Sequence, residues 1–99
     1  MDIRVGNGYD VHLLALGLEF WLGGIKVEHT KGCVAHSDGD TLIHALCDAM
    51  LGALALGDIG KHFPDNSAEF KGIDSKILLA RVNDLIKAKG YSLVNADCT

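Results

Sequence analysis

The stretch of sequence that decides the fold is SDGDTLIHALCDAMLGALALG, residues 37–57. Ser37 and Asp38 are both typical N-cap residues, and a mainly apolar run follows them. Gly57 is a typical residue for ending a helix. The pattern therefore predicts a helix that starts at Ser37 or Asp38 and runs to about Leu56.

Strand signals precede this helix. Ile3 to His12 alternates between apolar and other residues, which predicts a first strand running into a loop. Glu19 to Val27 predicts a β-hairpin, because Gly23 and Gly24 sit between two short apolar runs. Residues 32–39 are predicted to form a loop.

A second helix follows an aperiodic region. Residues 58–72 have no periodicity, and connections of this length without regular structure are often functional. Asp74 or Ser75 is predicted to cap a helix that ends at Gly90. Tyr91 to Thr99 is predicted to start another strand. Strands and helices in this order indicate an α+β protein.

Composition narrows the class of protein. The 99 residues suit one domain, 1–99, and 48% hydrophobic residues are enough for a core. The net charge of −4 gives no basic field for nucleic acid or an anionic membrane. No basic, apolar leader starts the chain, and the three cysteines form no Cys-x-x-Cys pair. Reduced thiols in a cytoplasmic compartment are therefore expected.

The types and spacing of three residues, Asp10, His12 and His44, indicate a metal site. Asp10 and His12 are separated by one residue, so in an extended segment their side chains point the same way. His44 lies on the predicted helix, where Asp40 and Asp48 flank it at four-residue spacing. One carboxylate and two imidazoles are a ligand set of catalytic zinc sites with an open fourth position. Asp40 and Asp48 are the predicted partners of the second His44 ring nitrogen.

Two other interpretations of these residues stay open. His44 is equally well explained as a core histidine whose hydrogen bond goes to Asp48. The pairs Cys33-x-x-His36 and His44-x-x-Cys47 have the composition of a structural Cys2His2 zinc site. Only seven residues separate these pairs, and the second lies inside the predicted apolar helix. No pattern for a protein nucleophile is present, because Ser37 beside His36 does not form a triad.

Several ordered motifs resemble the 2-C-methyl-D-erythritol 2,4-cyclodiphosphate synthase family. The match covers essentially the whole chain. Its motifs are GYDVH at 8–12, AHSDGD at 35–40, HAL at 44–46 with DA at 48–49, LGDIGK at 56–61, FPD at 63–65, FKG at 70–72, DS at 74–75 and AKGY at 88–91.

The resemblance implies a reaction and a fold. The family closes a diphosphocytidyl methylerythritol phosphate into a cyclic diphosphate and releases CMP, in non-mevalonate isoprenoid synthesis. The 2-phosphate of the substrate is the nucleophile, so this phosphorus–oxygen lyase needs none of its own. The implied fold is a mixed β-sheet packed against α-helices. The implied assembly is a homotrimer with active sites between subunits, in the cytoplasm or a plastid-type organelle.

The family's site residues carry over to matching positions. Asp10, His12 and His44 would hold zinc, with Asp10 and His12 also facing the substrate. His36 and Ser37 would contact the phosphate end, with His36 as the catalytic group that stabilises the transition state. The methylerythritol unit would be held by Asp58, Ile59 and Gly60, beside a mobile loop of Phe63, Pro64, Asp65, Asn66 and Ser67.

The family's chains continue beyond Thr99. The resemblance implies that the later part carries most of the cytidine pocket and a glutamate for a second metal, magnesium or manganese. This chain is then either truncated or a portion of a longer molecule. A non-catalytic zinc-binding fragment is the alternative to the active enzyme.

Overall fold

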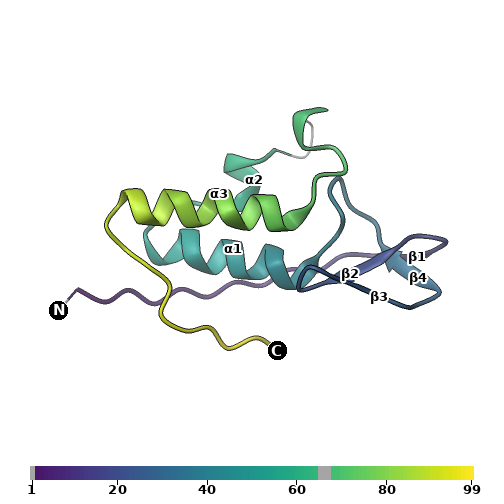
Figure 1. Cartoon of the computed structure of the whole chain (residues 1–99), viewed down its shortest axis with the longest axis horizontal. Coiled ribbons are helices and arrows are strands. Elements are labelled where there is room, and N and C mark those ends of the chain that lie inside the picture. The colour runs from purple at the N-terminus through teal and green to yellow at the C-terminus, as the bar shows by residue number, and fades with distance from the viewer. Residues whose placement is uncertain (1, 65–67) are drawn as a thin grey trace.

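Within residues 2–64 and 68–99, which the computed structural model describes, two long helices lie beside two short strand pairs (Figure 1). Both long helices begin at the end of the molecule where the strands lie. The elements in chain order are β1 (Leu14–Leu16), β2 (Phe20–Leu22), β3 (Ile25–Val27), β4 (Lys31–Cys33), α1 (Thr41–Ala53), α2 (Ile59–His62), the short 3-10 helix η1 (Ala68–Phe70) and α3 (Ser75–Ala88).

The first long helix starts later than its sequence predicts. Asp40, and neither Ser37 nor Asp38, is the N-cap, and its carboxylate accepts the Ile43 N–H at 3.0 Å. The helix also ends at Ala53, before the predicted Leu56. The chain then turns through a positive φ of 95° at Gly57, the glycine expected to end the helix.

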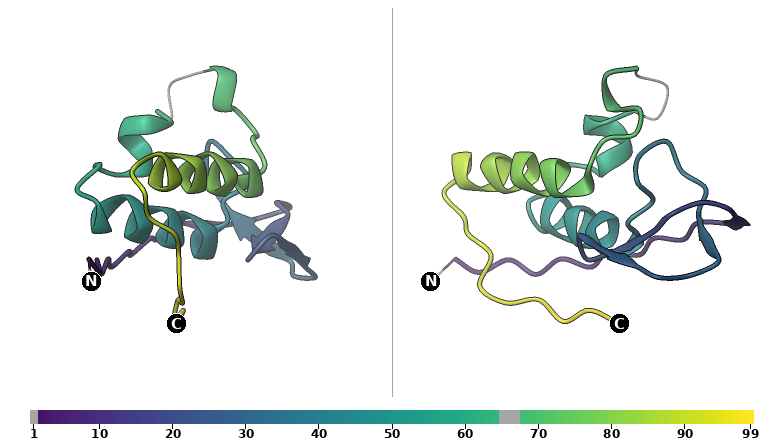
Figure 2. Two further views of the ribbon diagram at one scale, coloured as in Figure 1. Left: turned by 60° about the vertical axis from the view of Figure 1, so that its left-hand side comes forward. Right: turned by 45° about the vertical axis from the view of Figure 1, so that its right-hand side comes forward.

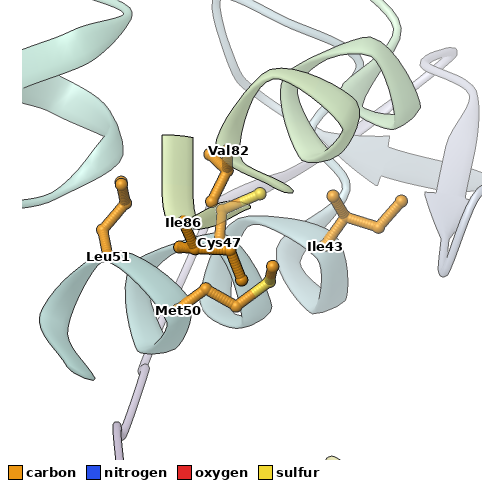
Figure 3. Packing of buried hydrophobic residues seen from close by; sticks show 6 residues of the cluster. All are labelled: Ile43, Cys47, Met50, Leu51, Val82 and Ile86. Atoms are coloured by element: carbon orange, nitrogen blue, oxygen red, sulfur yellow. The ribbon is translucent and has the colours of Figure 1, made fainter. Parts of the chain in front are cut away.

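The second long helix agrees with its prediction. Asp74 caps α3 by accepting the Lys76 N–H at 2.9 Å, and Gly90 follows the helix with a φ of +84°. The core forms where α1 and α3 face each other, and Figure 3 shows apolar side chains of both helices meeting there. Its fully or nearly fully buried members are Ile43, Cys47, Met50, Leu51, Val82 and Ile86.

The strands form two antiparallel pairs among the described residues. The predicted hairpin is present, with Leu22 opposite Ile25 and both turn glycines at positive φ. The pairing of β1 with β4, which sets Leu14 opposite Cys33, was not predicted. The loop prediction for residues 32–39 is therefore wrong at its start, where two residues belong to β4.

The two terminal segments are extended but belong to no ladder in the described part of the chain, so their prediction as strands is wrong here. Residues 3–12 run along α1 instead (Figures 1 and 2). Gly6 and Gly8 make this approach possible, because an added Cβ would lie 1.9 and 1.8 Å from the carbonyl oxygens of Ala49 and Ala45. Periodicity predicts an extended chain, whereas pairing depends on what lies beside it.

The segment after α1 contains more structure than expected. Residues 58–72 were predicted to be irregular, but α2 and η1 lie within them. Asp58 caps α2 by accepting the Lys61 N–H at 2.9 Å. The α+β class is confirmed. No helix in the described ranges combines the length and the apolar character needed to cross a bilayer.

Candidate metal centre

The extended N-terminal segment and α1 together position three metal-type ligands. Gly8 lets the segment lie directly against the backbone of Ala45, the residue that follows His44 in α1. Asp10 and His12 follow at alternate positions, so both face the helix. The sequence therefore brings together, through a glycine contact, ligands that lie more than thirty positions apart in the chain.

The donor atoms of Asp10, His12 and His44 converge. One ligand atom from each residue lies within 4.8 Å of the others, and this is the only such group of three among the residues searched, 2–64 and 68–99. Nδ1 of His12 lies 3.0 Å from Oδ2 of Asp10, and Nδ1 of His44 lies 3.4 Å from the same oxygen. The two imidazole centroids are 5.3 Å apart.

Two of these converging atoms have no hydrogen bond. Oδ2 of Asp10 and Nδ1 of His12 are buried, and despite their short separation they do not meet hydrogen-bond geometry with each other or with another group. Leaving buried polar atoms without a partner costs about 1–3 kcal/mol each. A divalent cation between these atoms would remove that cost, so the residues fit a metal such as zinc.

The outer nitrogen of His44 has partners that differ from those predicted. Nε2 lies 2.9 Å from Oγ of Ser75 and 3.1 Å from Oγ of Ser37. The prediction that Asp40 or Asp48 binds this nitrogen is wrong. Asp40 is fully buried and accepts the backbone N–H groups of Gly23, Gly24 and Ile43, whereas Asp48 accepts that of Ile59.

Asp48 links α1 to α2 behind the site. Its Oδ1 accepts the Ile59 N–H at 2.9 Å. Burial raises the pKa of this carboxyl, and the Ile59 N–H partly opposes the rise. The carboxylates of Asp58 and Asp10 raise the pKa further, whereas His44 lowers it. The contact fixes the start of α2 against α1, and thereby one wall of the site.

A cleft of about 280 Å³ opens beside the three ligands. Most of the residues predicted to bind substrate line it. Asp58 lies at the start of α2 as its cap, Pro64 does not line the cleft, and Asp65, Asn66 and Ser67 lie outside the described residues. The lining residues are Asp10, His12, Val34, Ala35, His36, Ser37, His44, Ile59, Gly60, Phe63, Ile73 and Leu78.

Sequence reasoning missed several members of this wall. Val34, Ile73 and Leu78 are apolar residues whose place in the cleft follows only from tertiary packing. Ser75 was assigned a capping role, yet its hydroxyl contacts His44. The motif Asp74-Ser75 contained the signal, because a serine at the start of a helix has a hydroxyl free for a partner when the preceding aspartate is the cap.

The alternative Cys2His2 site is not formed. Cys47 is fully buried in the core between α1 and α3, and burial raises its pKa to about 12, with smaller contributions from Asp48 and Asp40. Burial also raises the pKa of Cys33. Neither thiol belongs to a group of metal-type ligands in the described part of the chain.

Comparisons with known proteins agree with the motifs. A model of the YgbB family matches residues 3–99. The 2-C-methyl-D-erythritol 2,4-cyclodiphosphate synthase of Phocaeicola vulgatus is 64% identical over 99 residues, which are 100% of this chain and 62% of that protein. A solved structure of a synthase of this name has a TM-score of 0.83 at 42% identity, covering 88% of this chain and 58% of that one. A form with bound CDP has a TM-score of 0.81 at the same identity and coverage.

The matches also show how much of the related proteins this chain covers. The chain spans less than two thirds of the curated relative from Phocaeicola vulgatus. The family match, by contrast, covers nearly all of the chain. The resemblance expected from the ordered motifs is confirmed: the chain belongs to the YgbB family.

Proposed function

We propose that the protein acts in the synthesis of 2-C-methyl-D-erythritol 2,4-cyclodiphosphate, as a phosphorus–oxygen lyase of non-mevalonate isoprenoid biosynthesis. The observation that carries the proposal is the convergence of Asp10, His12 and His44 at a cleft, with two buried polar atoms unpaired. The names of the similar synthases support the reaction class.

The proposed reaction needs positioning more than protein nucleophiles. An oxygen of the substrate's 2-phosphate forms a bond to the β-phosphorus, and the bond from that phosphorus to the oxygen of CMP breaks. CMP leaves with the bonding electron pair. Zinc held by Asp10, His12 and His44 would supply Lewis-acid stabilisation of charge on the β-phosphate. The protein's contribution is to hold the diphosphate in line and to exclude water.

The phosphate end of the substrate is proposed to lie against His36 and Ser37. Both residues line the cleft beside His44. The Ser37 hydroxyl is already 3.1 Å from Nε2 of His44, so a phosphate there would lie close to the metal ligands. His36 is the proposed group that stabilises charge developing in the transition state.

The methylerythritol unit is proposed to lie against the start of α2. Ile59 and Gly60 line the cleft, and Asp58 caps the same turn. Phe63 also lines the cleft, and Pro64 with residues 65–67 would complete the substrate side. With these roles the cleft would bind the substrate as well as the metal.

Assembly into a homotrimer is part of the proposal. The odd-numbered apolar residues of the N-terminal segment point away from α1 and are 68–89% exposed. An exposed apolar row of this kind is typical of a surface that another chain covers. Its members are Ile3, Val5, Tyr9, Val11 and Leu13.

Cytidine and a second metal would be bound outside these 99 residues. A similar synthase is described in a form with bound CDP, which supports a cytidine nucleotide as part of the substrate. A second divalent cation, magnesium or manganese, would neutralise charge near the leaving phosphate. The proposed location is the cytoplasm, or a plastid-type organelle in a eukaryote.

The second candidate function is a non-catalytic zinc-binding fragment. If the protein consisted of these 99 residues alone, it would lack the proposed cytidine and second-metal groups. The mass of the purified protein separates the two ideas. A mass near 10.5 kDa favours the fragment, and a clearly larger mass favours the enzyme.

The test is a CMP-release assay with zinc and magnesium on protein of verified mass. We expect the longer protein to turn over, and Asp10→Asn to lower turnover by about 100-fold or more through the loss of a metal ligand. Ser92→Ala, an exposed change after α3, is the matched control. Equal turnover by Asp10→Asn and the control would overturn the proposal.

A further inference from the structure

A chain of hydrogen bonds behind His44 plays no part in the proposed reaction. Oγ of Ser75 lies 2.9 Å from Nε2 of His44 and donates its hydrogen to Oδ1 of Asp38 at 2.5 Å. The backbone N–H of Ser75 donates to the other carboxylate oxygen of Asp38 at 2.9 Å. Ser75 is fully buried, and His44 is nearly so.

The count of hydrogens in this chain decides the tautomer of His44. A serine hydroxyl has one hydrogen, and that of Ser75 goes to Asp38. Toward Nε2 of His44 the same oxygen can therefore only accept, so the 2.9 Å contact favours the ring hydrogen on Nε2. Oγ of Ser37, which lies 3.1 Å from the same nitrogen, can accept this hydrogen as well. The neutral ring then presents a lone pair at Nδ1, the atom that lies 3.4 Å from Oδ2 of Asp10.

The three residues come from three parts of the fold. His44 is in the first turns of α1, Ser75 is the first residue of α3, and Asp38 is in the segment after β4. The carboxylate of Asp38 also accepts the Asp40 N–H at 3.1 Å, beside the cap of α1. The backbone N–H groups of Asp40 and Ser75 therefore fix the orientation of the Asp38 carboxylate.

We propose that Ser75 and Asp38 are positioning residues that hold His44 in its Nε2–H tautomer, with Nδ1 aimed at the metal. The inference rests on the proposed metal site. It adds two residues that would orient His44 for metal binding in the metal-free protein. Groups of this kind typically change metal affinity by about 10–100-fold when removed.

The first measurement uses the unaltered protein without metal. Nitrogen NMR of 15N-histidine-labelled protein distinguishes a protonated from an unprotonated ring nitrogen. His44 should show hydrogen on Nε2 and none on Nδ1. Hydrogen on Nδ1 would overturn the proposal, whatever the variants do.

The second measurement is Zn²⁺ affinity by competition with a chromophoric chelator. Ser75→Ala should weaken Zn²⁺ binding by about 10–100-fold and leave His44 as a mixture of tautomers. Val82→Ala, which opens a cavity in the core and removes no hydrogen-bond partner of His44, controls for lost stability. Unchanged affinity in Ser75→Ala, or an equal loss in Val82→Ala, would contradict the proposal.

A double-mutant cycle tests whether the two residues act as one chain. If Asp38 acts through Ser75, the variant carrying both Ser75→Ala and Asp38→Ala should bind Zn²⁺ about as weakly as the weaker single variant. Losses that simply add would show independent roles and overturn the inference. Failure of the metal site itself is recognised separately, because His44→Ala would then retain Zn²⁺ in full.

Discussion

At the scale of single residues, the candidate metal centre depends on one close contact between the N-terminal segment and α1. Gly8 lets the N-terminal segment touch the α1 backbone, and this contact places Asp10 beside His44. The unpaired Oδ2 of Asp10 then has a metal as its natural partner. A small residue outside the ligand set therefore decides whether the ligands meet.

Gly8→Ala should separate the ligands. The added Cβ would lie 1.8 Å from the Ala45 carbonyl oxygen, so the segment must lift away from α1. We expect a loss of about 1–3 kcal/mol in the free energy of unfolding, as for other overpacked sites, together with weaker Zn²⁺ binding. Chemical denaturation and zinc titration measure the two effects.

Gly52→Ala is the matched control for this change. Gly52 lies within α1 with nothing near its added Cβ, so alanine should be neutral or stabilise the helix by about 0.5–1 kcal/mol. If Gly8→Ala behaved like Gly52→Ala, the close approach of the segment to α1 would be wrong.

Thiol reactivity should follow burial. Cys98 is exposed, whereas Cys33 and Cys47 are buried. Because burial raises the pKa of Cys47 to about 12, almost no thiolate exists there near neutral pH. Alkylation with iodoacetamide, followed by peptide mass spectrometry, should modify Cys98 first. Early modification of Cys47 would contradict its place in the core.

At the scale of elements, Asp40 joins the hairpin to α1. Its buried carboxylate accepts from Gly23 at 2.9 Å, from Gly24 at 2.6 Å and from Ile43 at 3.0 Å. One side chain therefore caps the helix and holds the β2–β3 turn. The turn's positive φ values turn both N–H groups toward this carboxylate, so the glycine pair serves the helix as well as the hairpin.

Asp40→Ala should cost more than the loss of an ordinary cap. Three backbone N–H groups would lose their buried acceptor, and we expect a loss of about 2–4 kcal/mol in the free energy of unfolding. Asp74→Ala is the comparison, because its exposed carboxylate caps only α3 and should cost about 1 kcal/mol. Equal losses by urea denaturation would show that the hairpin contact contributes nothing.

The limits of sequence-based prediction are visible in these elements. α3 was predictable because its apolar period, its cap and its terminal glycine all act locally. The N-cap of α1 was not, because Asp40 is selected over Ser37 and Asp38 by its contact with a turn sixteen residues earlier. Asp10, His12 and His44 were identifiable by type and spacing, whereas Ser75 was hidden because its partner comes from another helix.

At the scale of the whole molecule, the N-terminal segment has two different faces. Its even-numbered residues Gly6, Gly8, Asp10 and His12 meet α1 and the metal ligands, whereas its odd-numbered apolar residues face outward. The alternation of residue types that predicted a strand therefore places the metal ligands on one face of the segment and the exposed apolar row on the other. In the proposed trimer this row would be covered by other copies.

Self-association should depend on that row. We expect light scattering after size exclusion to show a mass above that of one chain, and Val11→Glu to lower it, because a charge in a buried apolar contact is costly. Ser92→Glu places the same charge at an exposed site after α3. A mass of one chain at all concentrations would contradict the proposed assembly.

The most direct test of the account is the zinc content of His44→Ala beside that of the unaltered protein. Both are loaded with Zn²⁺, freed of excess metal and analysed by mass spectrometry of the metal. His29→Ala, which removes an exposed histidine away from the cluster, is the control. We expect one zinc per chain in the unaltered protein and in His29→Ala, and little or none in His44→Ala. Full retention of zinc by His44→Ala would contradict it.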